Sequence, residues 1–171
     1  MTRLTALLLV GFLTMVVLAP IGRVLPSWLP LPSIPVLVTL YLALGVRGSH
    51  SAGAACAAAL GYVTDLLAGA PKGTYILALL IVYFAVRGLS ARLYVQGRLS
   101  QIGVSFAASL FCAVLAVSIH VALPPRGSWS ALTMAPAEAA LTAALAAPYF
   151  YLLWRVDRRV AREAATEGVF R

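Results

Sequence analysis

Hydrophobic positions along the chain gather into long apolar runs, which are separated by short segments rich in proline, glycine and arginine. A helix needs about 20 apolar residues to cross the hydrocarbon core of a bilayer. Four of the runs approach this length. The two shorter runs can cross the bilayer only with the help of their flanking residues. The pattern therefore predicts six membrane-spanning helices, at residues 4–21, 34–46, 51–68, 74–86, 102–123 and 134–154.

Prolines interrupt the pattern just before the second run, within residues 26–35. Proline lacks a backbone donor and clashes with the preceding turn, so this stretch cannot be regular helix throughout. We expect it to follow the outer membrane interface and to enter the membrane with Pro32 or Pro35 in the first helical turn. A re-entrant loop that lines a cavity is the alternative.

Composition strengthens the membrane interpretation. The chain has 171 residues, of which 62% are hydrophobic and 11% charged, and its mean hydropathy is +0.95. In soluble domains about a quarter of the residues are charged. The charged fraction of this chain is less than half of that, so a soluble domain is excluded. We expect an all-α integral membrane protein, with one transmembrane domain at residues 1–154 and a basic cytoplasmic tail at residues 155–171.

The formal net charge of +8 reflects membrane topology better than nucleic-acid binding, because no groove of interleaved basic and aromatic residues is apparent. Six spans with a cytoplasmic N-terminus leave only Arg23, Lys72 and Arg126 outside, of thirteen Lys and Arg residues. A topology of five spans with the N-terminus outside also leaves three of these cations on the outer side. The charge distribution therefore predicts a cytoplasmic tail but does not decide on which side the N-terminus lies. We favour six spans, because residues 34–46 are uniformly apolar.

Small residues recur every four positions in the third run, at Gly53, Ala57, Gly61 and Gly69, with Asp65 in the same series. Residues four apart are neighbours on a helix, so they form a strip of small side chains. Such strips let another helix approach closely in a membrane. Asp65 is therefore expected on or beside a packing face.

Two carboxylates, Asp65 and Glu138, are expected near the outer ends of their helices. A charge near a helix centre costs about 2.5–3.5 kcal/mol on insertion scales, so it usually faces protein. Each can be a helix cap, a salt bridge or a snorkelling side chain. Asp65 can also organise the turn at residues 69–73 and the surface that a partner helix meets. A proton relay or a substrate-binding carboxylate is a third alternative.

Enzymatic and metal sites find no support in the sequence. Cys56 and Cys112 lie in apolar runs without metal-ligand spacing, so they are expected to be buried packing residues. No phosphate-binding glycine loop, metalloprotease motif or nucleophile elbow is present. We therefore expect neither catalysis nor a cofactor.

The segment at residues 61–73, with the sequence GYVTDLLAGAPKG, resembles a signature of the bacterial rod shape-determining MreD family. The similarity centres on Gly61, the Asp65-Leu66-Leu67 triplet, Gly69, Pro71 and Gly73. It extends upstream to Pro32 and the apolar run that ends at residues 44–48, and downstream to the basic stretch at residues 83–92. The length, the six-span layout and the basic tail are also similar.

The resemblance implies a non-enzymatic scaffold of the cell-elongation machinery in the bacterial inner membrane. Its partner would be MreC, a single-span protein, which would link it to MreB filaments, RodA and penicillin-binding protein 2. The family also resembles the six-helix substrate-binding components of vitamin transporters. A substrate-binding subunit of an energy-coupling vitamin transporter is therefore the alternative function. An assembly factor of another complex is a third.

Overall fold

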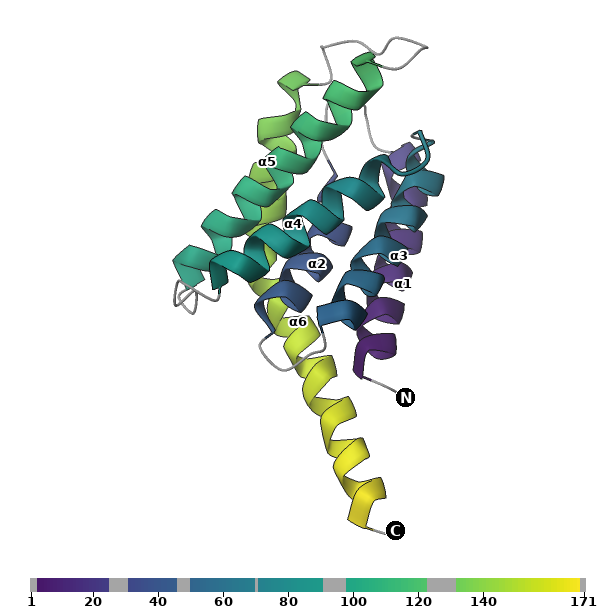
Figure 1. Ribbon diagram of the computed structural model, residues 1–171, viewed down its shortest axis with the longest axis vertical. Coiled ribbons are helices and arrows are strands. Elements are labelled where there is room, and N and C mark those ends of the chain that lie inside the picture. Colours follow the sequence, from purple (N-terminus) through teal and green to yellow (C-terminus); the bar gives the residue numbers. More distant parts are fainter. Residues whose placement is uncertain are drawn as a thin grey trace.

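The computed structural model describes residues 3–24, 31–45, 50–69, 71–90, 98–122 and 132–169. Within these ranges all regular secondary structure is helical, with no strand, which confirms the predicted all-α class (Figure 1). The helices are α1 (Arg3–Val24), α2 (Ile34–Leu44), α3 (His50–Ala68), α4 (Thr74–Ser90), α5 (Arg98–Ala122) and α6 (Ala135–Val169).

Four of these helices, α1, α3, α5 and α6, are long and apolar enough to cross a membrane. The other two are shorter apolar helices. The 11 residues of α2 extend about 16 Å, roughly half of the hydrocarbon thickness. The prediction that α2 and α4 also cross the bilayer stays a prediction.

Helix α2 lies at the centre of the bundle and packs against each of the other five helices. Its residues Ile34–Leu40 are all buried, and Leu37, Val38 and Leu40 have no exposed surface. A helix that is apolar on every side is stable only when protein or lipid surrounds it completely. This explains why the second run lacks an amphipathic pattern.

The start of α2 agrees with the proline pattern, since Pro35 occupies its second position. Proline is tolerated there because the first backbone N–H groups of a helix have no intrahelical partner. Residues 25–30 of the proline-rich segment, for which an interfacial path was expected, lie outside the described residues, as do residues 91–97 of the basic loop.

Helix α6 is the longest element, with 35 residues, and its final turns extend beyond the other helices (Figure 1). The helix continues through the boundary at residue 154 that the sequence suggested between membrane domain and tail. The start of α1 and the end of α6 lie toward the same end of the molecule (Figure 1).

Candidate functional site: the α3–α4 hairpin

The Asp65 carboxylate joins the end of α3 to the beginning of α4. It is 2% exposed, and each of its oxygens accepts one backbone hydrogen bond. The Gly73 N–H donates to Oδ2 at 2.8 Å, and the Tyr75 N–H donates to Oδ1 at 2.8 Å. Both donors lie at the start of α4, where N–H groups lack intrahelical acceptors. Asp65 therefore caps α4 from the neighbouring helix by accepting two of these backbone N–H groups.

The turn between the two helices depends on glycine at two positions. Gly69 has φ +63° and Gly73 has φ +100°, values that a residue with a Cβ rarely adopts. Between them, the Pro71 carbonyl accepts a hydrogen bond from the Thr74 N–H at 3.2 Å. The spacing of Asp65, Gly69, Pro71 and Gly73 thus corresponds to one capped turn.

The small-residue strip on α3 packs against α4 of the same chain. A Cβ built on Gly61 would lie 2.6 Å from the Ile76 Cα, and one on Gly53 would meet the Tyr83 hydroxyl. Ala57, between the two glycines, has no exposed surface. The helix that approaches this strip is therefore an internal one. We refer to α3, α4 and the turn between them as the α3–α4 hairpin.

Glu138, the second carboxylate singled out in the sequence, lies in the first turn of α6 and is partly buried. Its backbone N–H donates to the Met134 carbonyl at 3.0 Å, and its carbonyl accepts the Thr142 hydroxyl at 2.7 Å.

A cluster of hydroxyl groups, which the sequence analysis did not identify, fixes the start of α2. The Thr142 hydroxyl donates to the Glu138 carbonyl at 2.7 Å and accepts the Ser33 N–H at 3.0 Å. The Ser109 hydroxyl donates to Thr142 Oγ1 at 3.4 Å. The cluster joins α2, α5 and α6. Its sequence signal is weak, because Ser and Thr often bond only to their own helix, as Thr64 does.

Arg87, near the end of α4, binds the other end of α2. Its guanidinium donates to the Gly45 carbonyl at 2.8 Å and to His50 Nδ1 at 3.2 Å. The Tyr83 hydroxyl, one turn earlier, donates to the His50 carbonyl at 3.3 Å. Arg87 and Tyr83 thus bridge α2, α3 and α4.

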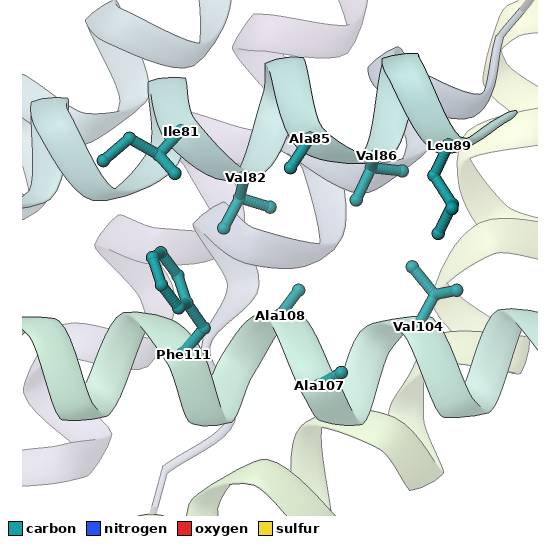
Figure 2. Close-up of a pocket in the computed structure, with 9 residues that line it drawn as sticks. All are labelled: Ile81, Val82, Ala85, Val86, Leu89, Val104, Ala107, Ala108 and Phe111. Atoms are coloured by element: carbon teal, nitrogen blue, oxygen red, sulfur yellow. The ribbon is translucent and has the colours of Figure 1, made fainter. Parts of the chain in front are cut away.

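An apolar groove of about 400 Å³ lies between α4 and α5 (Figure 2). Its α4 side carries Ile81, Val82, Ala85, Val86 and Leu89, and its α5 side carries Val104, Ala107, Ala108 and Phe111. Every lining residue is aliphatic or aromatic. The groove therefore suits an apolar helix or a lipid chain better than a polar small molecule.

The described residues offer no arrangement for metal chemistry, since no group of three or more His, Cys, Asp or Glu side chains is present among them. Cys56 and Cys112 are free and buried. The Asp65 carboxylate instead joins α3 to the start of α4 through two backbone hydrogen bonds.

Comparison with known proteins gives one match. A family model described as rod shape-determining protein MreD matches residues 1–155, far beyond the residues 32–92 that carried the sequence resemblance. No curated protein and no solved structure matches the chain. The match confirms the family resemblance. The likeness to transporter substrate-binding components is not confirmed.

Proposed function

The chain belongs to the MreD family of rod shape-determining proteins, and on that premise we propose that it is a non-enzymatic scaffold. The family assigns it a role in rod shape determination, and its long apolar helices agree with a multi-pass inner-membrane protein. The scaffold would bind an MreC-like single-span partner and thereby connect MreB filaments with RodA and penicillin-binding protein 2. The family match over residues 1–155 is the observation that carries this proposal.

The topology that we propose has six crossings, with both termini in the cytoplasm. The start of α1 and the end of α6 lie toward the same end of the molecule, which supports an even number of crossings (Figure 1). The positive-inside rule supports the cytoplasmic assignment, because Arg155, Arg158 and Arg159 lie close together near the end of the last span. The polar contacts of the hairpin turn would then face the outer leaflet.

The α4–α5 groove is the contact surface that we propose for the partner's membrane span. The strip of Gly53, Ala57 and Gly61 already packs against α4, so a partner has to bind elsewhere. In the groove, Ala85, Ala107 and Ala108 lie between larger apolar side chains (Figure 2). Small residues in a groove allow a second helix to approach closely.

The test is co-purification of the tagged chain with its MreC-like partner. We expect the double variant Ala85→Leu/Ala107→Leu to lose the partner, because both alanines are exposed and the added side chains fill the groove. Ala59→Leu, at an exposed alanine of α3, is the matched control and should retain the partner. Normal capture by the double variant at wild-type membrane levels would exclude the groove as the contact.

The role of Asp65 in this proposal is indirect. By capping α4, it would keep the α4 side of the groove in position. We expect Asp65→Asn to insert normally but to bind the partner less well. The vitamin-transporter alternative has no support in the comparisons.

A further inference from the structure

The end of α6 presents two different faces. Phe150 and Leu153 are buried, with Leu153 fully covered. On another face, Tyr151 is 61% exposed and Trp154 is 47% exposed. The inward face is occupied by the bundle, so the outward face is available to lipid or to another molecule.

Three arginines continue this outward face. Tyr151, Trp154, Arg155, Arg158 and Arg159 follow at helical spacing and line an open surface hollow of about 350 Å³. The Arg158 guanidinium carbon lies 5.0 Å from the centre of the Trp154 ring, a cation–π contact that holds the guanidinium in place. We call these five residues the arginine–tryptophan face.

The face carries a concentrated positive charge. Asp157 is the only acidic residue between Trp154 and Val160. It belongs to the side of α6 that meets α2, where the Tyr41 hydroxyl donates to Asp157 Oδ2 at 3.3 Å. The hollow is therefore lined by guanidinium and aromatic groups, a chemistry that suits a phosphate better than a neutral ligand.

The position along α6 identifies the source of such a phosphate. Measured from Ala135, Trp154 lies about 28 Å and Arg158 about 35 Å along the helix axis. The hydrocarbon core is about 30 Å thick. The indole therefore reaches the boundary of the hydrocarbon, where tryptophan is favoured, and the guanidiniums reach the level of the lipid headgroups.

We propose that the arginine–tryptophan face binds the phosphate of an anionic phospholipid from the adjacent leaflet. Arg155, Arg158 and Arg159 donate to the phosphate oxygens, and the rings of Tyr151 and Trp154 pack against the glycerol region. The positive-inside rule requires only cations on this side of the membrane. It does not require a guanidinium held over an indole beside a hollow. The proposal rests on membrane insertion and not on the scaffold function.

Trp154 itself can report the bound lipid. The chain has three tryptophans, and Trp28→Phe/Trp129→Phe leaves Trp154 as the only one. This variant is placed in nanodiscs of neutral lipid that contain a small fraction of brominated phosphatidylglycerol or brominated phosphatidylcholine, and quenching is compared. We expect the anionic lipid to be enriched at Trp154 about fivefold over the neutral one.

Variants on this background separate a site from general charge attraction. Arg155→Gln/Arg158→Gln should bring quenching by the two lipids to the same level. Arg158→Lys keeps the charge but loses the planar fork, so it should show an intermediate preference. Lys72→Gln removes a cation from the exposed α3–α4 turn and should leave the preference unchanged.

Two outcomes would overturn the proposal. The first is equal quenching by both lipids in the background variant. The second is loss of the preference when inorganic phosphate is added to the sample, which would identify a site for free phosphate rather than for a lipid headgroup. A preference that survives phosphate and depends on the arginines supports it.

Discussion

Gly61 of α3 lies directly against the backbone of Ile76 in α4, so closely that a Cβ on Gly61 would stand 2.6 Å from the Ile76 Cα. Four residues later, Asp65 binds the N–H groups of Gly73 and Tyr75. The same surface of α3 thus provides both the closest packing and the polar cap. Close packing and two hydrogen bonds therefore join the helices of the α3–α4 hairpin.

Gly61→Ala should destabilise the protein by about 1–3 kcal/mol, because the added methyl group overpacks against backbone that cannot rotate away. The measurement is thermal unfolding of the purified protein in detergent. Gly88→Ala is the control on α4, where nothing lies within 4 Å of an added Cβ. It should be stabilising by about 0.5–1 kcal/mol through reduced backbone entropy. Equal stability of the two variants would refute the close approach.

Asp65→Asn should cost about 1–3 kcal/mol, because its amide nitrogen would replace one of the two acceptor oxygens. One N–H at the start of α4 would then remain unsatisfied. Thr64→Val is a neighbouring control, since the Thr64 hydroxyl bonds only to the Leu60 carbonyl of its own helix. In thermal unfolding, the midpoint temperatures of the wild type and Thr64→Val should be similar, and that of Asp65→Asn should be clearly lower. The cap would be unimportant if Asp65→Asn matched Thr64→Val.

Arg87→Lys separates the bridging role of this residue from its charge. Lysine preserves the positive charge that topology requires, but its single ammonium cannot reproduce the bonds to Gly45 and His50 together. We expect a loss of about 1–3 kcal/mol in detergent with unchanged membrane orientation. Arg155→Lys, on the exposed end of α6, should leave stability in detergent unchanged. An Arg87→Lys variant as stable as the wild type would show that the bridge contributes little to stability.

Each of the six apolar runs overlaps one helix of the described residues, because long apolar runs and their breaks indicate where such helices lie. The sequence also identified Asp65 and the turn glycines, whose residue types are unusual for their place. It did not predict which helix packs on Gly61, since a small-residue strip is the same for an internal and an external partner. It missed the Thr142 cluster and the Arg87 bridge, because both join segments far apart in the chain.

The short length of α2 shows a different limit. The prediction that residues 34–46 span the membrane rests on their uniformly apolar sequence, and it stays a prediction. In the structure α2 ends at Leu44, and Arg87 binds the following Gly45 carbonyl. An apolar run gives the same pattern in lipid and in a protein core, so its burial among five helices could not be read from it.

The most direct test of the account is depletion of this chain in its native host, with cell width and length followed by microscopy. We predict that rods widen into spheres, that the wild-type gene restores them, and that Gly61→Leu does not. Rods that keep their width and length throughout depletion would contradict the proposed role in cell shape.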